Sequence, residues 1–273
     1  MSLIDSLHRK LDSLALSPIL RPIFTRSARK AFIANRNRNL FFGVYPSWEE
    51  ALAASGEYGV VGYDNEGSAV LYDQRLRVDD HDYPALHWLN RSLQDGLRGV
   101  FDVGGAIGIK FIAFRESLDC FPDLVWRVYD VPAMVAHGRE LAAARGYVPR
   151  LQFTDSFHEG EGLEILFVSG ALQYLPHTLS ELLSTYKQLP RRVIINTTPV
   201  HPDYEFFTVN SIGTAFCPYR IQTQRSLIRR LSALGYRLRE SWINPGKALR
   251  IPCRPDLELD HYSGYCLELA SKT

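Results

Sequence analysis

The chain has 273 residues, a formal net charge of +1 at pH 7, and ordinary hydrophobic (46%) and charged (22%) fractions. These values suit one large soluble domain, or one domain with an appendage, and the balanced charge gives no general argument for nucleic-acid binding. The four cysteines are scattered, without a CxxC pair or a histidine at ligand spacing. We therefore predict reduced thiols and no metal site.

Membrane and targeting signals are absent from the sequence pattern. No apolar run approaches the roughly 20 residues that span a bilayer, and the N-terminus alternates apolar and charged residues, unlike a secretory signal. We expect a cytoplasmic protein. The first forty residues nevertheless hold eight Lys or Arg residues against two Asp residues. This basic segment could be solvated, touch a membrane surface peripherally, contact an acidic partner, or exchange between the subunits of a homodimer.

The first hundred residues are expected to be helical and irregular. Apolar residues fall on one helical stripe over 3–14, and NRNRN at 35–39 indicates a loop. Ser47 is a good N-cap for a short helix, and another helix is predicted over 83–98. We predict that residues 1–98 form a helical cap or lid and that 99–273 form the main domain.

From residue 99 onward, short apolar strands alternate with helical patterns, which is typical of a parallel α/β sheet. The predicted strands lie at 100–103, 125–129, 151–153, 165–169 and 193–196. The predicted helices lie at 107–118, 132–145, 177–188 and 223–234. Two later apolar stretches, 236–243 and 262–269, are joined by a segment containing Pro and Gly, so they are predicted to form a β-hairpin.

The stretch FDVGGAIG at 101–108 is the first strand-to-helix turn of this sheet. Ligands of open α/β sheets bind beyond the carboxyl ends of the strands, at such a turn. A dinucleotide-binding GxGxxG would need a glycine where this chain has Val103. The sequence instead fits D-x-G-x-(G/A)-x-G, as Asp102, Gly104, Ala106 and Gly108. The acid would repel a pyrophosphate, but it can accept a hydrogen bond from an ammonium group.

Acids follow the next two predicted strands as well. Asp130 ends the second strand at the distance expected of a ribose-binding carboxylate, and Val131 beside it could pack on an adenine ring. Asp155 follows the third strand and could accept a hydrogen bond from the adenine amino group. Each acid alone could be a helix cap or a loop residue. Acids at three successive strand ends favour a nucleoside site.

These motifs resemble the cofactor half of class I methyltransferases, which use S-adenosyl-L-methionine. More narrowly, residues 41–243 resemble a family of bacterial methyltransferases found among surface-polysaccharide and other biosynthetic genes. The segments that carry this resemblance are FFGVYPSWEEAL, YPALHWLN, WRVYDVP, LQYLP, RVIINTTP, FTVN and CPYRI.

The resemblance implies a Rossmann-like fold with a seven-stranded mixed sheet of order 3-2-1-4-5-7-6. It implies that the cofactor is held by the glycine turn and by the residues that follow the strands. The expected cofactor-binding residues are Asp102, Gly104, Gly105, Ala106, Gly108, Asp130, Val131, Asp155, Ser156, Ser169 and Gly170. The chain departs from the family in having Asp130 where Glu is common, and Asn196-Thr197 where an acid and an Arg are common.

The residues that act on the acceptor are less well defined by the sequence. Gln173 occupies the position of a catalytic histidine in plant-type O-methyltransferases, and it cannot act as a base near neutral pH. The candidate catalytic residues are His201, Tyr174 and His177. The candidate substrate-binding residues are Gln173, Tyr219, Arg220 and Tyr45. Each has an ordinary structural alternative, in helix capping, packing or a loop salt bridge.

The predicted function is transfer of a methyl group from S-adenosylmethionine to an oxygen or nitrogen of a small molecule or sugar intermediate in a biosynthetic pathway. Two alternatives stay open. One is a protein that binds S-adenosylmethionine or S-adenosylhomocysteine without turnover, and the other is an NAD-dependent oxidoreductase.

Overall fold

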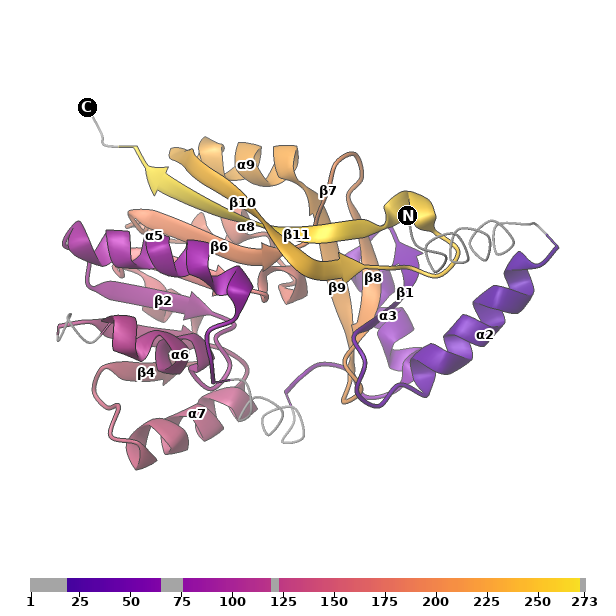
Figure 1. Ribbon diagram of the computed structural model, residues 1–273, viewed down its shortest axis with the longest axis horizontal. Coiled ribbons are helices and arrows are strands. Elements are labelled where there is room, and N and C mark those ends of the chain that lie inside the picture. The colour runs from indigo at the N-terminus through magenta and orange to yellow at the C-terminus, as the bar shows by residue number, and fades with distance from the viewer. Residues whose placement is uncertain (1–18, 65–75, 119–122, 271–273) are drawn as a thin grey trace.

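The computed structural model describes residues 19–64, 76–118 and 123–270. These residues form a seven-stranded sheet covered by helices on both faces, and a separate four-stranded sheet (Figure 1). No helix in the described ranges combines the length and the apolar character needed to cross a membrane.

The large sheet has the predicted order of strands. Across the sheet its strands are β10 (Tyr236–Leu249), β11 (Leu259–Leu269), β6 (Arg192–Thr198), β5 (Ile165–Ser169), β2 (Gly99–Val103), β3 (Val125–Tyr129) and β4 (Leu151–Thr154). The strands from β6 to β4 run parallel, and β11 is antiparallel to both β6 and β10. Numbered from β2 along the chain, this order is 3-2-1-4-5-7-6. The predicted fold class is confirmed.

Helices bury both faces of the large sheet. One face packs against α5 (Tyr83–Gln94), α6 (Ile109–Leu118) and α7 (Pro132–Ala144), around a core that includes Phe111 and Trp126. The other face packs against α8 (Leu179–Leu183) and α9 (Gln224–Ala233), around Leu183 and Leu227. Burying apolar side chains on both faces explains why β5 is apolar from Ile165 to Val168 rather than alternating.

Helix α8 is shorter than the predicted helix at 177–188. It begins at a capping box, in which Thr178 and Glu181 each bond to the other's backbone N–H. It ends because the Ser184 and Thr185 hydroxyls donate to the carbonyls of Glu181 and Leu182, which competes with continuation of the helix. The sequence pattern shows the apolar spacing but not this competition.

The four-stranded sheet corrects two expectations. Its order is β1 (Leu40–Tyr45), β8 (Phe206–Ser211), β9 (Phe216–Thr223) and β7 (Val200–His201). No strand was expected in the N-terminal segment or between the fifth predicted strand and α9. Strand β1 pairs with β8 in antiparallel register, with Phe41 opposite Asn210. Its backbone partners are therefore remote in the chain, where local patterns give no sign of them.

Helices α2 (Arg21–Ile33) and α3 (Trp48–Tyr58) lie beside the small sheet (Figure 1). The Ser47 cap of α3 is confirmed, since its hydroxyl accepts from the Glu50 N–H at 3.2 Å. The loop at 35–39 is also confirmed, whereas the predicted helix over 3–14 lies outside the described residues. The predicted helix at 83–98 ends earlier, at Gln94, and packs on the large sheet. The division of the chain at residue 98 stays a prediction.

The β10–β11 hairpin connects the two sheets. Its far end contributes Leu249, Leu257 and Leu259 to a core that also contains Phe41 and Tyr219 of the small sheet. Figure 1 shows the hairpin running from the edge of the large sheet to the small one. The small sheet is thereby held beyond the carboxyl ends of the parallel strands, where ligands of such folds bind.

Candidate functional site

The glycine turn after β2 has a backbone that ordinary side chains would disturb. Gly104 has φ +71°, and a Cβ there would lie 2.2 Å from Ala171 Cβ. Ala106 also has a positive φ, of 51°, in the region that L-residues seldom occupy. A Cβ at Gly108 would lie 2.9 Å from a methyl group of Leu151, which confirms that this glycine allows α6 to approach the sheet.

Asp102 lies directly beneath this turn. Its side chain is 1% exposed, and its Oδ2 accepts a hydrogen bond from Trp126 Nε1 at 3.0 Å. A Cβ at Gly105 would fall 2.3 Å from Asp102 Oδ2, so the carboxylate and the turn are in close contact. Burial raises the pKa of Asp102 to about 7, although the bond from Trp126 opposes this shift. The site thus holds an acid whose charge a bound cation would stabilise.

Asp130 holds the turn in place. Its Oδ2 accepts from the Ala106 N–H at 2.7 Å and its Oδ1 accepts from the Val131 N–H at 2.8 Å. Burial raises the pKa of Asp130 to about 6, against the lowering effect of these two bonds. The sequence predicts that Asp130 binds a ligand, and the structure adds its hydrogen bond with Ala106. Each oxygen retains a second acceptor direction for a ligand hydroxyl.

Asp155 and Ser156 follow β4 on the same edge of the sheet. Asp155 is exposed, and the Ser156 N–H donates to the Thr154 hydroxyl at 3.0 Å. Phe157, which follows them, packs against Phe101 and inside the core on that side. The structure therefore leaves the Asp155 carboxylate open to solvent at the predicted adenine end.

The end of β5 offers free space and an unpartnered polar atom. Gly170 has φ +74°, and a Cβ there would meet no atom within 4 Å. Ser169 Oγ accepts from Asn196 Nδ2 at 3.4 Å. Gln173 is 3% exposed, and its Nε2 donates to the Gly170 carbonyl at 2.7 Å, while its Oε1 has no hydrogen-bond partner among the described residues. An unpartnered buried amide oxygen is costly unless a ligand satisfies it.

Tyr174 and Tyr219 lie where the two sheets meet. The Tyr174 hydroxyl donates to Asn210 Oδ1 at 2.7 Å, and the two tyrosine rings meet edge to face at 4.9 Å. The Tyr219 hydroxyl donates to that of Tyr262 at 2.9 Å, and burial holds the pKa of Tyr219 well above its usual value. These contacts join the small sheet to the hairpin and to the segment after β5. Because its pKa is raised, Tyr219 does not act as a base near neutral pH.

His201 is not placed to act as the predicted general base. Its Nδ1 accepts from the backbone N–H groups of Asp203 and Tyr204, at 3.1 and 3.0 Å. Its Nε2 therefore carries the proton and donates to the Asp256 carbonyl at 3.1 Å. His201 is 4% exposed and uses both ring nitrogens to hold local backbone. His177 is exposed and directly precedes the N-cap of α8.

Arg220 and Tyr45 also make structural contacts. Arg220 Nη2 donates to the Pro176 carbonyl at 2.6 Å, and its guanidinium lies over the Phe207 ring. The Tyr45 hydroxyl is 3.1 Å from that of Tyr58, within the small sheet's own core. Neither side chain shares a contact with the glycine turn.

The structure also brings together a group of residues that the sequence did not single out. The 3₁₀ turn η1 (Asp80–Asp82) precedes α5, and Asp82 within it is fully buried. Asp82 accepts two bonds from Lys110 Nζ, at 2.7 and 2.8 Å, and one from the Asp79 N–H at 3.0 Å. Lys110 lies in the first turn of α6, immediately after the glycine turn. In the sequence, this group could have been indicated by four consecutive ionisable residues, DDHD at 79–82.

Asn196, at the end of β6, connects η1 to the strand ends. Its Nδ2 donates to the His81 carbonyl at 3.2 Å, and its Oδ1 accepts from Trp242 Nε1 at 3.0 Å and from Asn244 Nδ2 at 2.9 Å. The next residue, Thr197, has φ 54°, an unfavourable backbone for a β-branched side chain. Strained backbone conformations cluster at functional sites, and they persist only where the surrounding structure holds them in place.

Comparison with known proteins yields no matching family model and no matching curated protein. Among solved structures, the chain is similar to a 1,6-didemethyltoxoflavin N1-methyltransferase from Burkholderia thailandensis, crystallised with its acceptor and S-adenosylhomocysteine. That match has a TM-score of 0.50 at 16% identity, and it covers 82% of this chain and 90% of the other.

Two other solved structures match less closely. The magnesium protoporphyrin IX methyltransferase of Synechocystis has a TM-score of 0.45 at 12% identity, with coverage of 92% and 98%. The CcbJ methyltransferase of Streptomyces caelestis has a TM-score of 0.46 at 14% identity, with coverage of 74% and 96%. The chain's own strand order and the Burkholderia match agree on one conclusion. The chain has the Rossmann-like fold of class I methyltransferases.

Proposed function

We propose that this protein is an S-adenosylmethionine-dependent methyltransferase that acts on a small-molecule or sugar-type acceptor. Asp102 is buried beneath the glycine turn, and Asp130 holds the turn by a hydrogen bond. The proposal rests on this turn, which is the first strand-to-helix turn of the class I methyltransferase fold. This is the place where open α/β sheets bind nucleosides.

The residues present fit this cofactor better than a dinucleotide. The Asp102 carboxylate lies where a Cβ at Gly105 would collide with it. A diphosphate lying on the turn would therefore face this carboxylate. A cofactor ammonium at the same place would instead gain a charge-assisted hydrogen bond from that carboxylate. The glycine that a dinucleotide turn requires is also replaced by the fully buried Val103. These features argue against the oxidoreductase alternative.

In the proposed complex, Asp102 and the turn hold the methionine end of the cofactor, Asp130 binds the ribose, and Asp155 faces the adenine. The bound cofactor supplies a methyl group already activated on a sulfonium. The protein's main task is then to bring acceptor and methyl group together in line and to exclude water. The open space at Gly170 and the unpartnered Gln173 Oε1 favour an acceptor beside the end of β5.

The acceptor is proposed to be small because the small sheet and the hairpin lie over this edge of the large sheet. The Burkholderia enzyme, which binds a small heterocycle, supports this choice of class. The proposed acceptor atom is an oxygen or a nitrogen, and the proposed reaction belongs to a biosynthetic pathway.

Calorimetry with S-adenosylhomocysteine and with NAD⁺ tests the proposal. We expect S-adenosylhomocysteine to bind and NAD⁺ not to bind. Asp130→Ala should weaken S-adenosylhomocysteine binding by about 1–3 kcal/mol, because it removes a charged hydrogen-bond partner and releases the turn. Glu116→Ala, at an exposed acid on α6, is the matched control and should bind normally. Binding of NAD⁺ alone would refute the proposal.

Turnover needs its own measurement, since a protein could keep the cofactor site without catalysis. Formation of S-adenosylhomocysteine from S-adenosylmethionine, dependent on an added acceptor, would establish the enzyme. Tight binding with no transfer to any acceptor would favour the binding-protein alternative.

A further inference from the structure

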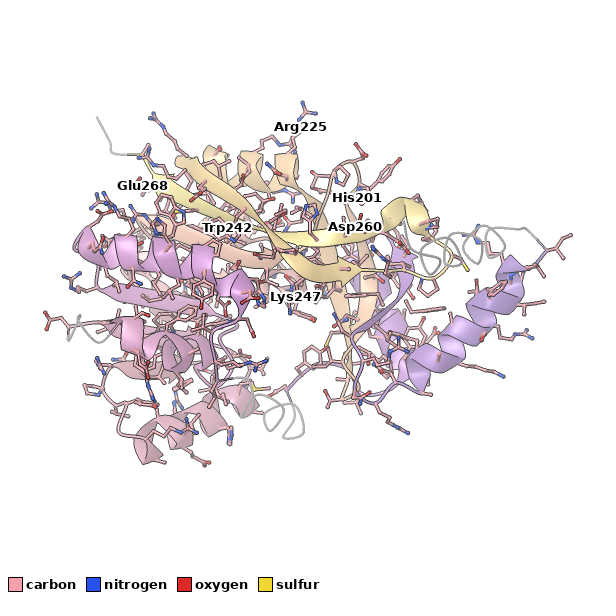
Figure 2. The ribbon with its side chains drawn as sticks, viewed as in Figure 1. His201, Arg225, Trp242, Lys247, Asp260 and Glu268 are labelled. Carbon is pink, nitrogen blue, oxygen red and sulfur yellow. The ribbon has the colours of Figure 1, made fainter. Side chains whose placement is uncertain are left out.

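A cavity of about 400 Å³ opens between η1 with the start of α5 and the β10–β11 hairpin. Its lining includes Asp79, His81, Pro84, Ile243, Asn244 and Lys247. Figure 2 shows Lys247 on the hairpin side of this space, near the start of α5. The cavity thus combines apolar walls with a histidine and charged groups from two separate parts of the fold, as small-molecule sites commonly do.

The turn η1, which forms one wall of the cavity, contacts the carboxyl ends of β5 and β6. Asn196 Nδ2 contacts Ser169 Oγ at 3.4 Å and the His81 carbonyl at 3.2 Å, so η1 lies against the ends of β5 and β6. The Lys110 ammonium joins Asp82 to the helix that begins at the glycine turn. His81 is therefore held between the cofactor turn and the acceptor side of the sheet.

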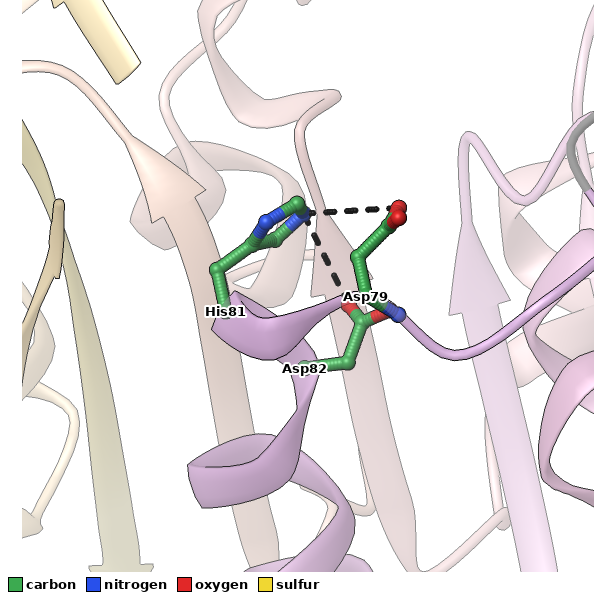
Figure 3. A group of neighbouring side chains, drawn as sticks. All are labelled: Asp79, His81 and Asp82. Atoms are coloured by element: carbon green, nitrogen blue, oxygen red, sulfur yellow. Dashed lines mark hydrogen bonds and ion pairs between the residues drawn. The ribbon is translucent and has the colours of Figure 1, made fainter. Parts of the chain in front are cut away.

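The His81 ring directs one of its nitrogens, Nε2, toward two carboxylates. Its Nε2 lies 3.9 Å from Asp79 Oδ2 and 3.9 Å from Asp82 Oδ1 (Figure 3). Within the described part of the chain, neither ring nitrogen has a partner at hydrogen-bond distance. This contrasts with His201, whose two nitrogens are both occupied by backbone groups.

The charges around His81 suit a group that gains a proton during a reaction. The facing groups are Asp79 and Asp82 on its own segment, Lys110 from α6 and Lys247 from β10. Burial lowers the pKa of His81, and the two lysines act in the same direction, which favours the neutral ring. The two carboxylates would stabilise an imidazolium once it forms.

We propose that His81 is the general base for the acceptor, and that the cavity beside it receives an acceptor with a neutral hydroxyl or ring N–H group. This inference rests on the proposed function. The acceptor atom bonds to the methyl carbon as the carbon–sulfur bond breaks, and that bond's electron pair stays on sulfur to give the thioether. The acceptor's proton passes to His81, with Nε2–H facing the two carboxylates and Nδ1 as the accepting atom.

The strain at Thr197 and the unpartnered Asn244 Oδ1 support a ligand at this place. Asn244 is fully buried, lines the cavity, and has no hydrogen-bond partner for its Oδ1 among the described residues. A carboxylic acid acceptor would need no base, because it is already deprotonated near neutral pH.

The first test needs no acceptor. Imidazole NMR spectra of the ¹⁵N-labelled full chain are recorded over pH, with and without S-adenosylhomocysteine, and the His81 signals are assigned by their loss in His81→Gln. We expect His81 to titrate below pH 6.5 and its signals to shift when S-adenosylhomocysteine binds. The signals of His87, which is exposed on the following helix α5, should not respond. A His81 ring protonated at pH 7, or unaffected by bound S-adenosylhomocysteine, would overturn the proposal.

The second test follows transfer of a labelled methyl group to pools of phenols, sugars, N–H heterocycles and carboxylic acids. We expect label in a hydroxyl or N–H compound, and a 10²–10⁴-fold lower kcat in His81→Gln, about the usual contribution of a general base. S-adenosylhomocysteine affinity should stay unchanged, and His87→Gln should keep wild-type rates. The wild-type rate should fall on the acidic side of the His81 pKa, and His81→Gln should lack this fall.

The outcomes separate the two proposals. Absence of S-adenosylhomocysteine binding to the wild-type chain would refute the proposed function itself. Binding and transfer that persist at the wild-type rate in His81→Gln, or label only in carboxylic acids, would overturn the role of His81 and leave the methyltransferase assignment intact.

Discussion

Lys110 Nζ lies 2.7 Å from Asp82 Oδ2 and 2.8 Å from its Oδ1, in an ion pair where the carboxylate is fully buried. The lysine belongs to the helix that starts at the glycine turn, and the aspartate to the turn that precedes α5. This pair connects the proposed cofactor site to the cavity that contains His81. Both sites therefore depend on a contact between segments that lie apart in the chain.

Loss of the Asp82 carboxylate should destabilise the fold. Asp82→Ala leaves the Lys110 ammonium, whose side chain is only 16% exposed, without its partner. We expect the free energy of unfolding to fall by about 3–5 kcal/mol, which is typical of breaking a buried pair from one side. Urea denaturation measures this change. Asp80→Ala, at the exposed neighbour in η1, is the control, and equal losses in the two variants would contradict the role given to Asp82.

Gly104 and Gly170 allow a matched test of backbone strain against packing. Both have positive φ, of +71° and +74°, but only at Gly104 would a Cβ collide with a neighbour, Ala171. Gly170→Ala should cost about 1 kcal/mol for the left-handed backbone alone. Gly104→Ala should cost about 1–3 kcal/mol more, because it also overpacks the turn. Thermal or urea unfolding of the two variants gives the difference, and similar values would show that the turn can relax.

Asp102 should make stability depend on pH in an unusual direction. Its folded-state pKa of about 7 lies above the unfolded value of 3.8, so the folded chain holds the proton more tightly. The free energy of unfolding should therefore fall as pH rises from about 4 to 7. Asp130, whose pKa is also raised, contributes with the same sign.

Asp102→Asn should remove that part of the pH dependence. The variant should gain stability relative to wild type between pH 5 and pH 8, by about 1–4 kcal/mol, and it should bind S-adenosylhomocysteine more weakly. Urea denaturation at both pH values and calorimetry check the two effects. A stability difference that does not change with pH would show that Asp102 is not buried with a raised pKa.

His201 should matter for stability and not for cofactor binding. His201→Ala frees the backbone N–H groups of Asp203 and Tyr204 and the Asp256 carbonyl. We expect a loss of about 1–3 kcal/mol in unfolding free energy, since buried backbone groups lose their partners. S-adenosylhomocysteine affinity, measured by calorimetry, should not change. A large loss of affinity with normal stability would restore His201 to the site.

Much of the proposed cofactor site could be predicted from the sequence, because its signals are local. Asp102, Gly104 and Gly108 fall within one strand-to-helix turn, and the acid at the end of the next strand follows from the regular βαβ repeat. The acceptor side could not be predicted in the same way. His201 follows a strand and looked equally suitable, but its environment, with three backbone partners, is formed only by the folded chain.

His81 illustrates the opposite case. It lies in a short charged segment before a helix, where exposed residues are ordinary. Its proposed role depends on Asn196 and Lys110, which hold η1 against the end of β6 and against α6. Neither contact leaves a trace in the sequence near residue 81.

The resemblance to class I methyltransferases implied the strand order of the large sheet, and the sequence by itself determined the positions of its strands and the acid beneath the glycine turn. These depend on hydrophobic periodicity and turn chemistry, which act over a few neighbouring residues. Only the tertiary structure decided that residues 40–45 pair with 206–211 as a second sheet, and that His81 rather than His201 has a free ring nitrogen beside a cavity. Strand pairing and burial involve residues that are distant in the chain, and they result from packing of the whole molecule. Short sequence segments therefore do not indicate which residues come together.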